Sequence, residues 1–87
     1  MLPPIILSIA GSDCSGGAGI QADIKTMSAL GGYAASVITA VTAQNTLGVQ
    51  SVYPIPADMV KAQITSVMDD LRPDAVKIGM VHDASIV

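Results

Sequence analysis

The chain has 87 residues, of which 51% are apolar and 13% are charged, and its formal net charge is −3. A chain of that length holds one small domain, and its low charge content disfavours disorder. The charges form no basic patch and no apolar run reaches the roughly 18 residues that span a membrane, so neither nucleic acid nor a membrane is expected as a partner.

The apolar run IILSIA, at residues 5–10, is the first predicted element. A short continuous apolar run is typical of a strand that is buried on both faces. After a glycine-rich stretch, apolar residues recur at helical spacing: Ile20, Ile24, Met27 and Leu30. A helix is predicted over them, ending at Gly31 and Gly32, because glycine commonly terminates helices.

Two further strands are predicted at residues 34–44 and 48–55, which are rich in β-branched residues or end at prolines. A second helix is predicted between Asp58, in its first turn, and Pro73, which stops it. Its apolar face consists of Val60, Ile64, Val67, Met68 and Leu71. A fourth strand is predicted at residues 75–80. This order predicts the α/β class, a mostly parallel sheet with flanking helices and right-handed crossovers.

The last residues indicate a longer protein. A third helix is predicted to begin after the fourth strand, with Asp83 or Ser85 as its N-cap, and the sequence stops at Val87. We therefore expect residues 1–87 to be the N-terminal part of one larger domain. The isolated piece is expected to be marginally stable or to associate, because it leaves a sheet face and an edge open.

The stretch GSDCSGGAGIQAD, at residues 11–23, places four glycines between the first strand and the first helix. Such a loop presents free backbone N–H groups and the positive end of a helix dipole, which suit an anion or a polar ligand. The segment GAGIQA matches the dinucleotide fingerprint, but it lies six residues after the strand and no acid follows at the expected offset. The loop lacks the lysine of a phosphate-binding Walker A motif. A purely structural turn remains the alternative.

Few other polar residues suggest chemistry. Cys14 has no accompanying catalytic pair, so a structural role is favoured; it can form no internal disulfide, and a cytoplasmic location is expected. His82 is left unassigned, and one Cys with one His cannot form a closed zinc site, so no metal site is predicted. Gln44 and Met80 lie where strands end, the place where α/β sheets bind ligands. Asp23 is either a solvated helix residue or part of that site.

The blocks SGGAGIQAD, VTAQNT and KIGM closely resemble the N-terminal part of the hydroxymethylpyrimidine/phosphomethylpyrimidine kinases, which are ribokinase-like enzymes of thiamine biosynthesis. The resemblance implies ATP and Mg²⁺ as cofactors. It implies transfer of the ATP γ-phosphoryl group to 4-amino-5-hydroxymethyl-2-methylpyrimidine and then to its monophosphate. It also implies that Gln44 pairs with the aminopyrimidine edge. Further residues implied to line the same pocket are Gly11, Ala18, Asp23 and Met80.

By the same resemblance, the catalytic residue, the anion hole and the adenine-binding segment are expected beyond Val87. The chain alone is therefore expected to be inactive, since phosphoryl transfer depends on those parts. The missing C-terminal part, or a homo-oligomer, would complete it. The alternative is a non-catalytic fragment that binds a small molecule or forms oligomers.

Overall fold

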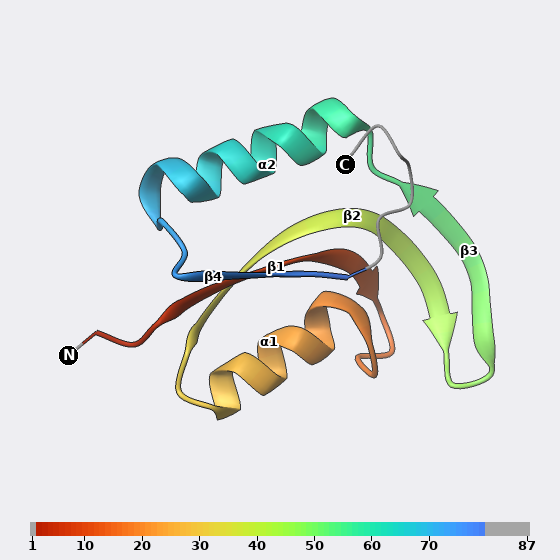
Figure 1. Ribbon diagram of the computed structural model, residues 1–87. Coiled ribbons are helices and arrows are strands. Elements are labelled where there is room, and N and C mark those ends of the chain that lie inside the picture. The colour runs from red at the N-terminus through yellow and green to blue at the C-terminus, as the bar shows by residue number, and fades with distance from the viewer. Residues whose placement is uncertain (1, 80–87) are drawn as a thin grey trace.

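The computed structural model describes residues 2–79, which form one four-stranded sheet with a helix on each face (Figure 1). The sheet order is β3-β2-β1-β4. The strands are β1 (Ile5–Asp13), β2 (Tyr33–Asn45), β3 (Gly48–Pro54) and β4 (Ala75–Ile78). β1 pairs in parallel with both β2 and β4, and β3 pairs antiparallel with β2. The predicted α/β class with a mostly parallel sheet is thus confirmed.

The two helices cover opposite faces because the chain moves in opposite directions along the sheet (Figure 1). Helix α1 (Gly19–Ala29) connects β1 to β2 on one side of β1, and helix α2 (Ala57–Asp70) leads to β4 on its other side. Crossovers of one hand require that a reversal of direction be matched by a change of face. Neither helix is long and apolar enough to cross a membrane, within residues 2–79.

The core follows the alternation of β1. Leu7 packs with Ala35, Val37 and Val60 in a buried cluster between the sheet and α2. On the other face, α1 buries Ile20 and Met27. These buried side chains are the apolar positions that the sequence pattern predicted, and their removal from water is the main stabilising contribution.

Three boundaries differ from the prediction. β1 continues past Ala10 to Asp13, because a register shift at Gly11 lets it keep pairing with β2. The first helix was predicted to include Leu30, but α1 ends at Ala29, and Leu30 occupies the C-cap position and is 82% exposed. The described part of the fourth strand ends at Ile78, and Met80 and His82, like the predicted start of a third helix, lie outside the described residues.

Gly19 brings the start of α1 against the backbone of β1. Its φ is +61°, and a Cβ at this position would overlap the carbonyl oxygen of Gly11. Only glycine satisfies both conditions, since other residues rarely adopt this φ and all carry a Cβ. The glycine loop therefore has a packing role at Gly19.

Candidate functional site

A cavity of about 440 Å³ lies where β1 ends, α1 begins and the β2–β3 hairpin extends beyond the sheet. This volume lies within the roughly 300–1,000 Å³ of small-molecule sites, and the end of parallel strands is where α/β sheets bind ligands. Residues from three segments line it: Gly11, Ser12, Asp13, Ala18, Gly19, Thr42, Gln44, Val49 and Val52.

Three of the predicted site residues meet in this cavity. Gly11, Ala18 and Gln44 all line it, although they come from β1, the glycine loop and β2. Asp23 is not among the lining residues and lies one turn farther along α1 than Gly19. Met80 is outside the described residues. The structure thus brings three of the five residues together and places Asp23 beside a different set of partners.

The carboxylate of Asp13 organises the glycine loop. Its Oδ1 accepts hydrogen bonds from the backbone N–H of Ser15 at 2.9 Å and from the Ser15 hydroxyl at 2.7 Å. Its Oδ2 accepts from the backbone N–H groups of Gly17 at 3.1 Å and Ala18 at 2.9 Å. Asp13 is only 3% exposed, and its carboxylate closes the loop into one defined turn.

These contacts change the interpretation of the loop as an anion site. The N–H groups of Gly17 and Ala18, which were expected to be free for a ligand, already bind the chain's own carboxylate. The Ser15 hydroxyl, and then the backbone N–H groups of the loop, lower the pKa of Asp13 below the usual 3.8, while burial acts in the opposite direction. The carboxylate is therefore charged at neutral pH and would repel a phosphate.

A second network holds the peptide unit between Ser12 and Asp13 from both sides. The backbone N–H of Asp13 donates to Gln21 Oε1 at 2.7 Å, and Gln21 Nε2 donates to the Ser12 hydroxyl at 2.8 Å. On the opposite side, the hydroxyl of Thr42 lies 2.6 Å from the Ser12 carbonyl oxygen. The floor of the cavity is thus fixed by side chains from both α1 and β2.

Gln44 is held by its backbone and faces the cavity with its side chain. Its backbone N–H donates to the Cys14 sulfur at 3.3 Å, and its carbonyl accepts from the Cys14 thiol at 3.1 Å. These hydrogen bonds give Cys14 a structural role, because they connect the loop to the end of β2. Gln44 Oε1 lies 2.9 Å from the Thr42 hydroxyl, and Gln44 Nε2 has no hydrogen bond within residues 2–79.

Asp23 forms a polar cluster with Ser8 and Lys77 beneath α1. Its Oδ2 accepts from the buried Ser8 hydroxyl at 2.6 Å and from Lys77 Nζ at 2.9 Å. The Ser8 hydroxyl first, and Lys77 in addition, lower the pKa of Asp23 below 3.8, against the effect of burial. Asp23 is therefore not merely a solvated helix residue, since it accepts from a buried hydroxyl and pairs with the half-exposed Lys77.

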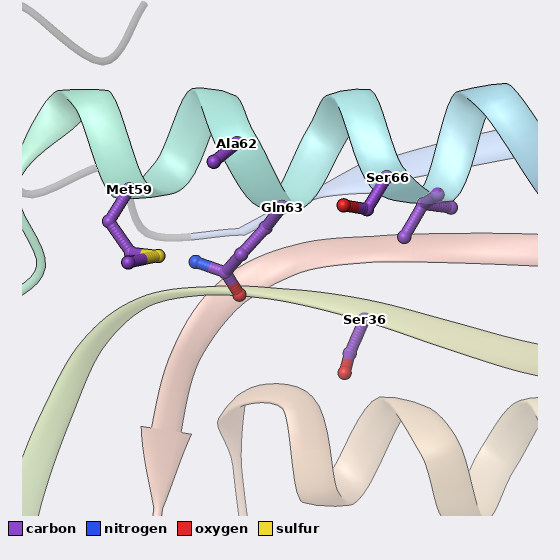
Figure 2. Close-up of a pocket in the computed structure, with 6 residues that line it drawn as sticks. Ser36, Met59, Ala62, Gln63 and Ser66 are labelled. Carbon is purple, nitrogen blue, oxygen red and sulfur yellow. The ribbon is translucent and has the colours of Figure 1, made fainter.

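A second cavity, of about 300 Å³, lies between α2 and β2 (Figure 2). There Gln63 extends from α2 toward β2, accepting from the Ile38 N–H at 2.9 Å and donating to the Ile38 carbonyl at 3.0 Å. β3 pairs with β2 only from Ala40 onward, so Gln63 takes the place of a strand partner at Ile38. The protein itself therefore satisfies both polar atoms of this amide.

Sequence reasoning missed several residues of the first cavity. Asp13 has a local signal, because an aspartate commonly forms a turn with the backbone two residues ahead of it, here at Ser15. Thr42, Val49 and Val52 have none, since only the hairpin geometry brings their side chains to the glycine loop.

Comparisons with known proteins identify relatives of this chain. The family model described as phosphomethylpyrimidine kinase matches residues 13–87. A hydroxymethylpyrimidine/phosphomethylpyrimidine kinase of Salmonella typhimurium is 64% identical over 81 residues, which cover 93% of this chain and 30% of that protein. The kinase of the same name from Streptomyces coelicolor is 56% identical over 85 residues, covering 98% and 32%.

Solved structures show the same fold. The crystal structure of phosphomethylpyrimidine kinase from Clostridium difficile 630 superposes with a TM-score of 0.92 at 58% identity, covering 95% of this chain and 36% of that one. A pyridoxal kinase from Staphylococcus aureus, in complex with AMP-PCP and pyridoxal, gives a TM-score of 0.87 at 36% identity, covering 97% and 31%. These likenesses confirm the predicted ribokinase-like α/β fold.

The chain spans about a third of the length of these curated relatives. Within that span the agreement is continuous, since the family model matches all but the first twelve residues. The chain therefore belongs to the phosphomethylpyrimidine kinase family.

Proposed function

We propose that this chain is the pyrimidine-binding, N-terminal part of a single ribokinase-like domain. The complete kinase, meaning this chain together with the part that its relatives possess beyond it, would transfer the γ-phosphoryl group of ATP to the hydroxymethyl oxygen of 4-amino-5-hydroxymethyl-2-methylpyrimidine. It would then phosphorylate the monophosphate. The observation that carries the proposal is the amide of Gln44, of which only one atom is hydrogen-bonded within residues 2–79, at a cavity of about 440 Å³.

The Gln44 amide suits the edge of an aminopyrimidine. One amide oxygen can accept from the exocyclic amine while the adjacent N–H donates to the neighbouring ring nitrogen. On one side of the cavity, Gly11 and Ala18 have no more than a methyl group as side chain and leave room for a ring. On the other side, Val49 and Val52 supply an apolar surface. A flat heterocycle with one polar edge fits this combination of surfaces.

Asp23 extends the proposed site toward β4, and Met80, which lies outside the described residues, is assigned to the same site by the family resemblance alone. Asp23 lies one helical turn from Gly19, and its carboxylate contacts the amine of Lys77 on β4. We place the hydroxymethyl group of the substrate on this side of the cavity. A charged carboxylate there would orient the hydroxyl through a hydrogen bond.

The described residues do not fit a magnesium–ATP site. The N–H groups of Gly17 and Ala18 bind Asp13, and no group of three His, Cys, Asp or Glu that could hold a metal ion occurs within residues 2–79. In this proposal ATP and Mg²⁺ bind to the remaining part of the kinase, and this chain binds and orients the acceptor alcohol. The chain alone should not turn over substrate.

The proposal is tested by calorimetric titration of the hydroxymethylpyrimidine and of ATP into the complete kinase and its Gln44→Ala variant. Loss of the amide leaves the polar edge of the ligand unpaired, which costs about 1–3 kcal/mol, so pyrimidine affinity should fall about 5- to 150-fold. ATP affinity should stay unchanged. Gln50→Ala, an exposed glutamine on β3 outside the cavity, is the matched control. Unchanged pyrimidine affinity in Gln44→Ala would exclude Gln44 from the site.

A further inference from the structure

The hydroxyl of Thr42 is shared between two groups that both accept hydrogen bonds. Its Oγ1 lies 2.6 Å from the Ser12 carbonyl oxygen and 2.9 Å from Gln44 Oε1. A hydroxyl has one hydrogen to donate and two lone pairs that accept, so it cannot donate fully to both. Thr42 is only 6% exposed, which leaves little access for water to resolve the conflict.

The two acceptors differ in their freedom to turn. The Ser12 carbonyl belongs to a peptide unit that Gln21 holds from the opposite side, through the Asp13 N–H and the Ser12 hydroxyl. A terminal amide, in contrast, exchanges its oxygen and nitrogen by a half-turn about its last bond, at almost no steric cost. The shorter distance, to Ser12, also marks the place of the hydroxyl hydrogen.

We propose that Thr42 is a specificity-determining residue, which donates to the Ser12 carbonyl and accepts from Gln44 Nε2. The Gln44 amide is then locked in one orientation, in which Nε2 faces Thr42. Oε1 and the remaining N–H of Nε2 form the edge that pairs with the ligand. This inference rests on the proposed function, since it concerns how Gln44 recognises the pyrimidine.

The locked amide distinguishes two classes of heterocycle. An aminopyrimidine presents a donor, the amine, beside an acceptor, the ring nitrogen. The 4-oxo analogue presents an acceptor, the carbonyl, beside a ring N–H donor, so its pattern is reversed. An amide that turns freely pairs with either edge, whereas a locked amide pairs with one.

A ring that turned over in the cavity could also reverse its pattern, but that solution would not support phosphorylation. The 5-hydroxymethyl group lies next to the amine, and turning the ring over moves it to the opposite side of the pairing edge. The reacting oxygen would then lie away from the phosphoryl donor. Discrimination is therefore expected above all in kcat/KM.

The test compares kcat/KM for 4-amino-5-hydroxymethyl-2-methylpyrimidine and its 4-oxo analogue in the complete kinase. The wild type should prefer the amine by about 100-fold or more, and Thr42→Val, which keeps the shape but removes the hydroxyl, should reduce the preference to less than about 10-fold. Thr42→Ser should restore it. Thr65→Val, an exposed threonine on α2, is the matched control.

The ratio of the two substrates is independent of the fraction of active protein, so partial misfolding of a variant does not alter it. If Thr42→Val does not fold, Thr42→Ala carries the same comparison. A preference in the hydroxyl-free variants equal to that of the wild type would overturn the role of Thr42. Failure of the wild type to bind the aminopyrimidine in calorimetry would instead overturn the proposed function, and this inference with it.

Discussion

Gln44 and Gln63 each extend into a cavity beside β2, and the protein satisfies their amides to different degrees. Gln63 has both amide atoms bonded to the backbone of Ile38, where no strand continues the sheet. Gln44 has one amide atom beside Thr42 and the other without a partner within residues 2–79. The volumes of the two cavities do not indicate which of them binds a ligand. The hydrogen bonding of the two amides differs, and an amide that the fold leaves half satisfied is available to a ligand.

The largest effect on stability is expected from Gly19→Ala, which would disrupt the packing of α1 against β1 that forms the Gln44 cavity. The new methyl group would overlap the Gly11 carbonyl, and alanine disfavours a φ of +61°. Destabilisation of about 3 kcal/mol or more is expected. Urea unfolding of the complete kinase measures it.

Gly17→Ala is the matched control for that prediction. A Cβ at Gly17 would lie 3.8 Å from the Asp13 carboxylate, an ordinary contact, so the change in stability should stay within about 0.5 kcal/mol. Equal stability of the two variants would show that the contact between α1 and β1 does not hold the cavity in place.

The next largest effect is expected at Asp13, because four hydrogen bonds of the loop depend on its charged carboxylate. Its pKa is lowered in the folded protein, so its stabilising contribution is complete above the usual value of 3.8 and is lost as the pH falls below 3.8 through the lowered pKa. Asp13→Asn should lower the melting temperature at pH 7 and weaken its fall on acidification.

Thermal unfolding of the complete kinase at pH 7 and at pH 3 measures the acid dependence. Asp70→Asn serves as control, since this exposed aspartate has no hydrogen bond in the described part of the chain. A wild-type melting temperature in Asp13→Asn at pH 7 would contradict the role of Asp13 in closing the loop.

Gln63→Ala tests whether the amide in the second cavity stabilises the fold and does not bind the ligand. It leaves the N–H and carbonyl of Ile38 without their side-chain partner, which should destabilise the kinase by about 1–3 kcal/mol. Pyrimidine affinity should be unchanged, the reverse of the result expected for Gln44→Ala. Weaker binding without loss of stability would place Gln63 in the ligand site.

The smallest effect is expected at Lys77, in the cluster with Asp23. The Lys77 side chain is half exposed, so Lys77→Met should destabilise the kinase by no more than about 1 kcal/mol. Asp23→Ala should cost more, about 1–3 kcal/mol, because the buried Ser8 hydroxyl loses its acceptor. Chemical denaturation of both variants gives the order of the two effects, and a larger loss in Lys77→Met would contradict it.

Substrate kinetics of Asp23→Asn test whether the Asp23 carboxylate contacts the substrate or only stabilises the fold. A carboxylate that orients the hydroxymethyl group should affect kcat/KM, whereas one that only binds Ser8 and Lys77 should affect stability alone. Wild-type kcat/KM in Asp23→Asn would remove Asp23 from the proposed site.

Local patterns predicted much of the fold because they report burial directly. The apolar run at residues 5–10 and the periodic positions Val60 and Ile64 are buried or partly buried, as expected. The end of α1 was predicted one residue too late, at Leu30, because helical spacing does not show at which residue a helix ends. Part of the candidate site could also be predicted from the sequence, because the predicted strand ends indicated Gln44 and the four glycines indicated the loop.

What the sequence by itself determined is the α/β class, the family and the segments that contribute to the cavity, because each depends on patterns along one stretch of chain. Only the tertiary structure decided how the polar groups are used. The Cys14 thiol meets the backbone of Gln44, and the Thr42 hydroxyl meets the Ser12 carbonyl. Hydrogen bonds join groups by distance and direction, and residues 30 positions apart acquire both only when β1 and β2 pair.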